Sequence, residues 1–99
     1  MAFKEIIWSE LAIAEFRNVL DYYVQNNGSA TYSNKLVLEV EKLLTLISQN
    51  ELIGRLTGNK FTRAIPLKHY IIFYEINYNT IEIISFWDSR QNPRKLKVE

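Results

Sequence analysis

The sequence contains no cysteine, and this absence excludes disulfide bonds, thiolate metal sites and a cysteine nucleophile. With only three glycines and two prolines, it has no glycine-rich phosphate loop, no linker and no low-complexity segment. Histidine occurs once, at His69, and the sequence shows no cluster of metal ligands, so we expect no metal and no cofactor. No apolar run approaches the ~20 residues that cross a bilayer. Glu5 and Glu10 interrupt any signal-peptide core, so we expect a cytoplasmic protein that does not contact the membrane.

The residues that are present indicate one folded domain over residues 1–99. Hydrophobic residues make up 47% and charged residues 23%, which is typical of a globular chain and not of a disordered one. The net charge is +1, but residues 1–51 hold four basic and seven acidic side chains, whereas residues 52–99 hold eight basic and four acidic ones. The second half is therefore the half suited to an acidic partner.

The first half predicts a strand followed by two amphipathic helices. Residues 3–8 are rich in β-branched and aromatic side chains, which favours a strand, and Ser9 is placed to cap the helix that follows. Gly28 is suited to the left-handed position that ends this helix, and Ser29 is placed to cap the next one. Apolar residues recur at helical spacing in two stripes, Ala12, Phe16, Val19, Leu20 and Tyr23 in the first helix and Tyr32, Leu36, Val40, Leu43, Leu44 and Ile47 in the second.

The second half predicts three strands, at residues 61–66, 70–76 and 80–87. A tight hairpin around Asn79, a residue type that tolerates positive φ, joins the last two. One register would place Glu75 opposite Glu82, an unfavourable like-charge pair that a three-residue loop would relieve, so the pairing at residues 77–80 stays open.

The expected fold is α+β in the order β-α-α-β-β-β, with an N-terminal α-hairpin packed on one face of a small, mainly antiparallel sheet. Both faces of the predicted strands are apolar, and two helices can cover only one of them. The other face is too hydrophobic to remain bare, so we expect a partner on it.

Several segments, taken in their order and spacing, resemble a known family. These are Ile6-Ile7-Trp8-Ser9-Glu10-Leu11-Ala12, Leu52-Ile53-Gly54-Arg55, Arg63-Ala64-Ile65-Pro66, Tyr70-Ile71-Ile72-Phe73-Tyr74-Glu75-Ile76 and the run from Ile81 to Pro93. Over nearly its whole length the chain resembles the RelE/ParE superfamily, the toxins of bacterial type II toxin–antitoxin modules. The resemblance implies a cognate antitoxin that wraps over the toxin, and contact with operator DNA only through that antitoxin.

The superfamily divides by mechanism. RelE-like members cut messenger RNA in the ribosomal A site without a metal, whereas ParE-like members lack the nuclease residues and act on DNA gyrase. Arg63 and Arg90 match arginines of the nuclease members, but Tyr70 stands where those members commonly have another arginine. Phe86-Trp87-Asp88 stands where they place a C-terminal His or Tyr. The resemblance therefore favours a gyrase inhibitor, with a ribosome-dependent nuclease as the alternative and a non-toxic binding domain on the same fold as a second one.

If the chain is a nuclease, Arg63, Arg90 and His69 are its candidate catalytic residues. Metal-free RNA cleavage needs a base, a proton donor and fixed positive charge at the phosphate. His69 is the side chain whose ordinary pKa lies near neutrality, and its alternative role is that of a turn residue. Arg63 binds phosphate or antitoxin in one interpretation and forms a structural ion pair in the other. The alternative for Arg90 is a surface salt bridge to Asp88.

Six residues are candidates for binding the antitoxin or the target: Arg63, Arg90, Arg94, Lys95, Trp87 and Tyr74. An acidic and apolar antitoxin segment is expected to lie across the second-half sheet and to meet these arginines and the basic tail. The two aromatic side chains could stack on a base, or they could belong to the packing of the sheet.

Overall fold

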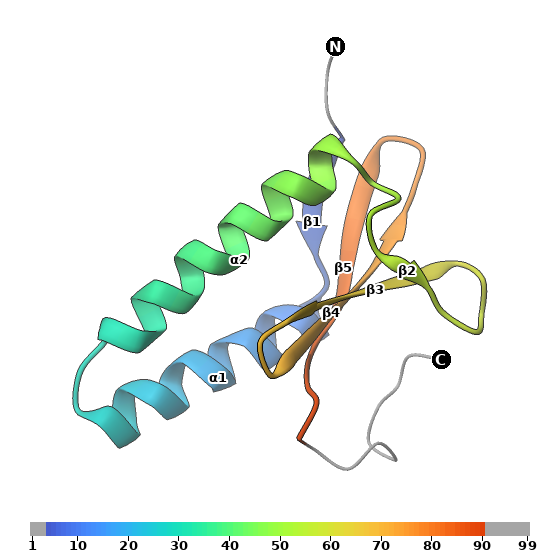
Figure 1. The fold of residues 1–99 in the computed structure, drawn as a ribbon. Coiled ribbons are helices and arrows are strands. Elements are labelled where there is room, and N and C mark those ends of the chain that lie inside the picture. Colours follow the sequence, from blue (N-terminus) through green and yellow to red (C-terminus); the bar gives the residue numbers. More distant parts are fainter. Residues whose placement is uncertain (1–3, 91–99) are drawn as a thin grey trace.

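The computed structural model describes residues 4–90 and confirms an α+β domain with two helices on one side of a five-stranded sheet (Figure 1). The elements are β1 (Glu5–Trp8), α1 (Glu10–Asn27), α2 (Thr31–Gln49), β2 (Arg55–Leu56), β3 (Thr62–Leu67), β4 (Tyr70–Ile76) and β5 (Thr80–Asp88). The sheet order is β1-β5-β4-β3-β2, and β1 pairs with β5 in parallel while the other pairings are antiparallel. The predicted strands are confirmed to within a residue or two, but the short edge strand β2 was not predicted.

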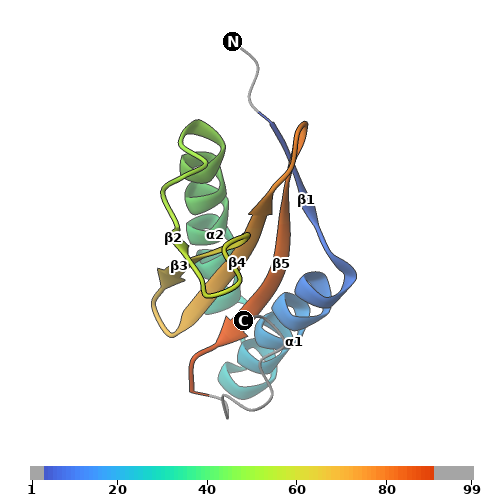
Figure 2. The same cartoon turned by 90° about the vertical axis from the view of Figure 1, so that its right-hand side faces the viewer.

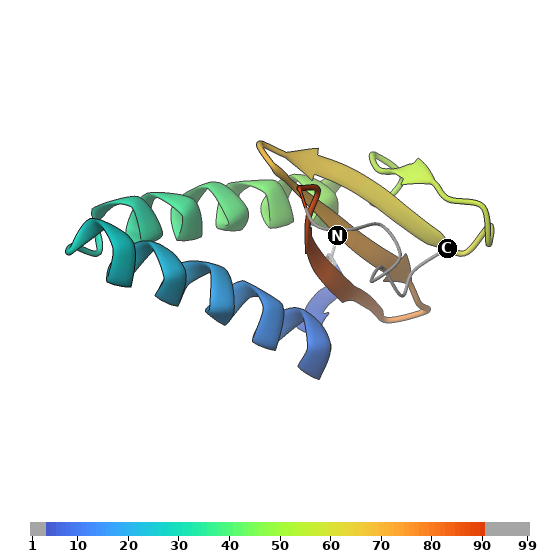
Figure 3. The same ribbon diagram turned by 90° about the horizontal axis from the view of Figure 1, so that it is seen from below.

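The two helices cover a single face of the sheet. Figure 1 and Figure 3 show them on the same side, and Figure 2, which looks onto the opposite face, shows α2 behind the strands. Both predicted helical stripes point into the core between helices and sheet. The buried cluster consists of Ala12, Leu36, Val40, Ile47, Tyr70, Ile72, Tyr74, Ile81, Ile83 and Phe86.

Ser9 joins β1 to α1 and confirms the predicted cap. Its hydroxyl accepts the N–H of Ala12 at 3.0 Å and donates to the carbonyl of Ile84 at 2.9 Å. Farther along α1, the carboxylate of Glu15 accepts the N–H of Phe86 at 3.0 Å. These two side chains therefore bond backbone groups of β5 beyond the end of β1, where none of the strands in residues 4–90 pairs with these groups.

The turn between the helices differs from the prediction at one residue. Gly28 has the expected left-handed conformation, with φ of 68°. The capping position of α2 is Ala30, which has no side-chain oxygen, and the hydroxyl of Ser29 reaches the N–H of Thr31 only at 3.4 Å. The prediction that Ser29 caps the second helix is therefore wrong, because α2 begins one residue later than that role requires.

The β4–β5 hairpin adopts the register that places Glu75 opposite Glu82. The hydroxyl of Thr62 donates to the carboxylate of Glu75 at 2.9 Å, and this bond offsets part of the like-charge repulsion. Within residues 4–90 the non-glycine residues with positive φ are Lys60 and Lys68, so the positive φ expected at Asn79 is not observed.

Candidate functional site

Arg63 lies on β3 and faces the helix side of the sheet, opposite Tyr74 on β4. Its Nη1 donates to the carbonyl of Gly54 at 2.7 Å and to that of Leu52 at 3.4 Å. The guanidinium therefore holds the connection between α2 and β2 through two backbone carbonyls, and it forms no ion pair among residues 4–90.

Arg90 follows the end of β5 and forms the predicted salt bridge to Asp88. Its Nε and Nη2 donate to the two carboxylate oxygens at 3.0 and 2.8 Å, and its backbone N–H donates to Oδ1 at 2.9 Å. Hydrogen bonding to Arg90 lowers the pKa of Asp88, and the same pair raises the pKa of Arg90. Because the Arg90 side chain is still 55% exposed, its remaining donor atoms stay accessible to solvent or to a partner.

His69 is an exposed residue of the turn between β3 and β4. Its carbonyl accepts both the N–H of Ser89, at 2.8 Å, and the hydroxyl of Ser89, at 2.6 Å. These bonds place His69 at the same end of the sheet as Arg90 and give its backbone the structural role of a turn residue.

The three candidate catalytic residues do not converge on one point. Arg63 is opposite Tyr74, whereas His69 immediately precedes Tyr70, which lies four residues earlier on β4. At the rise of an extended strand, Tyr70 and Tyr74 alone are about 13 Å apart. Because a metal-free phosphodiester reaction needs its acid, base and cation around one phosphate, the arrangement does not form such a site.

The two aromatic binding candidates are both buried. Tyr74 is fully buried on the helix side, where its hydroxyl donates to the carbonyl of Glu51 and accepts the N–H of Gly54, each at 2.8 Å. Burial raises the pKa of Tyr74. Trp87 is 6% exposed and pairs with Ile71. Tyr74 therefore has a structural role, and little of the Trp87 side chain is exposed to a partner, while Arg94 and Lys95 lie outside the described residues.

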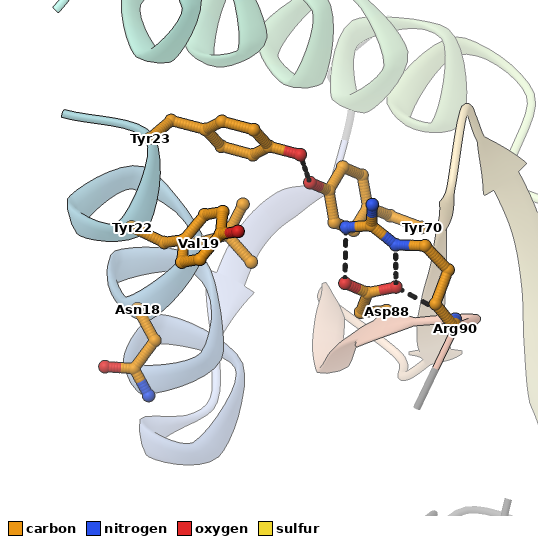
Figure 4. A pocket seen from close by; sticks show the side chains of 7 residues that line it. All are labelled: Asn18, Val19, Tyr22, Tyr23, Tyr70, Asp88 and Arg90. Atoms are coloured by element: carbon orange, nitrogen blue, oxygen red, sulfur yellow. Dashed lines mark hydrogen bonds and ion pairs between the residues drawn. The ribbon is translucent and has the colours of Figure 1, made fainter. Parts of the chain in front are cut away.

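A pocket of about 320 Å³ lies between α1 and the end of β5 (Figure 4). Its lining residues are Asn18, Val19, Tyr22, Tyr23, Tyr70, Asp88 and Arg90. The hydroxyls of Tyr23 and Tyr70 are 3.2 Å apart. The hydrogen bond to Tyr70, together with the nearby Arg90, lowers the pKa of Tyr23, whereas burial raises the pKa of Tyr70. In the sequence, Tyr23 belongs to the apolar stripe of the first predicted helix, and its spacing there gives no indication of this polar contact.

A larger groove, of about 610 Å³, lies on the sheet face opposite the helices. Its floor is formed by Ala64 and Pro66 of β3 and by Ile71 and Phe73 of β4, and Arg55 of β2 lies at its side. Arg55 forms no ion pair among residues 4–90, so its charge is available to a ligand. A partner meeting Arg63, Arg90 and the basic tail was predicted for this sheet, and Arg55 was not among the predicted cations. The excess of basic residues in the second half was the signal for a cation, but it could not distinguish Arg55 from Arg63.

The described residues show neither a metal site nor a membrane span. Within residues 4–90, no group of three or more His, Asp or Glu side chains is arranged to hold a metal ion. In the same range, no helix has the length and hydrophobicity that crossing a bilayer requires.

An α-hairpin on one face of a mixed five-stranded sheet defines the class of RelE/ParE-like proteins. The model of the ParE toxin of type II toxin–antitoxin systems matches residues 6–93, and the chain belongs to this family. The solved structure titled "Chromosomal ParDE TA system from P. aeruginosa" contains a chain with the same fold, at a TM-score of 0.74 and 19% sequence identity. The match covers 87% of this chain and 96% of that one. No curated protein sequence matches. Membership in the family implies a cognate antitoxin as a partner.

Proposed function

We propose that this ParE-family toxin arrests growth by inhibiting DNA gyrase in the cytoplasm and that it does not cut RNA. The observation that carries the proposal is the orientation of Arg63, whose guanidinium bonds the carbonyls of Leu52 and Gly54 on the helix side of the sheet. The cation that a nuclease would aim at the scissile phosphate is thus used to hold a loop.

The end of β5 supports the same proposal. A nuclease of this superfamily would have a His or Tyr near the segment Phe86-Trp87-Asp88. Phe86 is buried against Phe16 and Tyr70, with ring centroids 4.8 and 4.9 Å away, and Asp88 is occupied by Arg90. Each missing acid–base group costs about 10²–10⁴-fold in rate, so losing them leaves little cleavage.

The experiment is the addition of purified toxin to two assays, gyrase supercoiling of a relaxed plasmid and translation in a cell extract. We expect blocked supercoiling and intact messenger RNA. Messenger RNA cut within A-site codons, with the cuts abolished by Arg90→Ala, would establish the nuclease instead. An inducible chain that is folded but leaves bacterial growth unchanged would establish the non-toxic binding domain.

The groove on the open face of the sheet is the proposed site of the antitoxin. An extended segment with apolar side chains would cover Ala64, Pro66, Ile71 and Phe73, and an acidic side chain in it would meet Arg55. Such a segment, folding as it binds, buries apolar surface that the free toxin exposes. We expect Arg55→Glu to weaken binding of the cognate antitoxin by about tenfold or more, measured by calorimetry. Unchanged affinity would place the antitoxin elsewhere.

A further inference from the structure

The edge of the sheet farthest from β1 carries a concentration of exposed apolar side chains. Leu52, Ile53, Leu56 and Phe61, here called the apolar corner, belong to a single ten-residue stretch around β2. Phe61 is 76% exposed and Leu52 is 62% exposed. Scattered exposed apolar residues are ordinary, but four large ones in so short a stretch are typical of an interaction surface.

The backbone beneath the apolar corner is tied down on both sides of β2. Before β2, Tyr74 and Arg63 together bond the backbone of Glu51, Leu52 and Gly54. After β2, the side-chain oxygen of Asn59 accepts the N–H groups of Phe61 and Thr62, each at 2.8 Å. In the turn between β2 and β3, the N–H of Lys60 donates to the carbonyl of Thr57 at 3.0 Å.

This restraint matters because a side chain held on a rigid backbone loses less conformational entropy on binding. Phe61 is the strongest anchor of the four, since aromatic side chains supply large contact areas at few torsion angles. The corner is therefore preorganised to insert into a pocket of another protein.

The charges beside the corner indicate the chemistry of the pocket that the partner protein would present. Lys60 is exposed and forms no ion pair among residues 4–90, and Arg55 extends the positive charge toward the neighbouring groove. Glu51, the nearest carboxylate in sequence, is bonded to Lys4 at 3.2 Å. A partner that complements this surface has an apolar pocket with Asp or Glu at its rim.

We propose that the toxin binds its protein target through the apolar corner and that the target presents an apolar pocket with an acidic rim. The inference rests on the proposed function, because it assigns a surface to the inhibition of gyrase. The shape of the site distinguishes target from antitoxin. Leu56 borders the groove, but Leu52, Ile53 and Phe61 line neither the groove nor the pocket beside Arg90 and stand on an outer edge, whereas an extended antitoxin segment fits the adjacent concave groove.

The test compares Phe61→Ser and Leu52→Ser with Tyr78→Ser. Tyr78 is a matched control because it is also an exposed aromatic residue next to a strand, 91% exposed in the β4–β5 hairpin, and lies outside the corner. Growth inhibition after induction, gyrase supercoiling and binding of the cognate antitoxin are measured for each full-length variant. Circular dichroism and a urea midpoint establish that each variant is folded.

We expect Phe61→Ser and Leu52→Ser each to raise the toxin concentration for half-inhibition of supercoiling about tenfold or more and to relieve growth inhibition. Tyr78→Ser should change neither the half-inhibiting concentration nor growth inhibition by more than about twofold. Antitoxin affinity should stay within about twofold of wild type for all three variants. Folded corner variants that inhibit growth as strongly as the wild type would overturn the corner assignment. Corner variants that lose antitoxin binding while they still inhibit would assign the surface to the antitoxin instead.

The growth arm separates this inference from the proposed function. If the wild type arrests growth but leaves supercoiling intact, gyrase is not the target. Growth inhibition by the corner variants then still shows whether the corner binds the actual target. A folded wild type that does not arrest growth overturns both proposals.

Discussion

Tyr74 on β4 and Gly54 in the connection between α2 and β2 lie in direct contact, and the contact leaves no room for a side chain at residue 54. The N–H of Gly54 donates to the hydroxyl of Tyr74 at 2.8 Å, and a Cβ at residue 54 would lie 2.7 Å from that same oxygen. The glycine is therefore required by the close approach of a buried phenol and not by its own φ.

Gly54→Ala should destabilise the fold by about 1–3 kcal/mol, because either the Tyr74 ring or the loop has to move to admit the methyl group. The measurement is the free energy of unfolding from urea titration. Gly58→Ala is the matched control, since a Cβ there meets nothing within 4 Å, and it should change stability by less than about 0.5 kcal/mol. Equal effects at the two glycines would contradict the contact.

Ser9→Ala should cost about 1–2 kcal/mol, because it removes the cap of α1 and also the bond to the carbonyl of Ile84. Ser29→Ala should change stability by less than about 0.5 kcal/mol, since the Ser29 hydroxyl makes only bonds of 3.4 Å in an exposed turn. Thermal unfolding of the two variants under identical conditions compares them directly. A larger loss at Ser29 would mean that it caps α2 after all.

Arg63→Glu should destabilise the fold by about 1–3 kcal/mol, because it replaces a donor to two carbonyl groups with a carboxylate that repels them. Arg55→Glu makes the same change of charge one strand away, on an exposed side chain, and should leave the urea midpoint nearly unchanged. If Arg63→Glu unfolded at the wild-type midpoint, Arg63 would not be holding the loop.

The pair of Asp88 and Arg90 should add a pH-dependent contribution at the acid end of the stability profile. The pKa of Asp88 is lowered in the folded chain, chiefly by hydrogen bonds from Arg90, so the unfolded chain takes up the proton first as the pH falls. The stabilisation is fully present above the ordinary aspartate pKa and is lost as the pH drops through the lower folded value. The exposure of Arg90 keeps the contribution small because solvent screens the pair.

Asp88→Asn removes this titration and is the variant that tests it. We expect the difference in unfolding free energy between wild type and Asp88→Asn to be constant near neutral pH and to shrink as the pH falls below the ordinary aspartate pKa of about 4. Arg90 stays protonated throughout, because its pKa is raised from a value that is already high. A difference that does not vary with pH would show that the salt bridge does not persist in solution.

The sequence by itself determined the local features of this protein, because neighbouring residues are enough to produce them. Helical spacing of apolar residues located both helices, β-branched and aromatic runs located β1, β3, β4 and β5, and Ser9 and Gly28 marked the ends of α1. The excess of basic residues in the second half and the lack of cysteine were equally visible, and the order of the segments was enough to indicate the toxin family.

Only the tertiary structure decided what the candidate residues do, since each decision depends on groups far apart in the chain. Arg63 could have faced either side of the sheet until the register of β3 against β4 placed it under the loop that contains Leu52, eleven residues earlier in the chain. The sequence predicted Tyr74 to be a binding residue, but in the structure its hydroxyl bonds the carbonyl of Glu51 and the N–H of Gly54. The two-residue strand β2 has no periodicity to detect and exists because it pairs with β3, and that pairing positions Arg55 beside the groove and creates the exposed edge that carries Phe61.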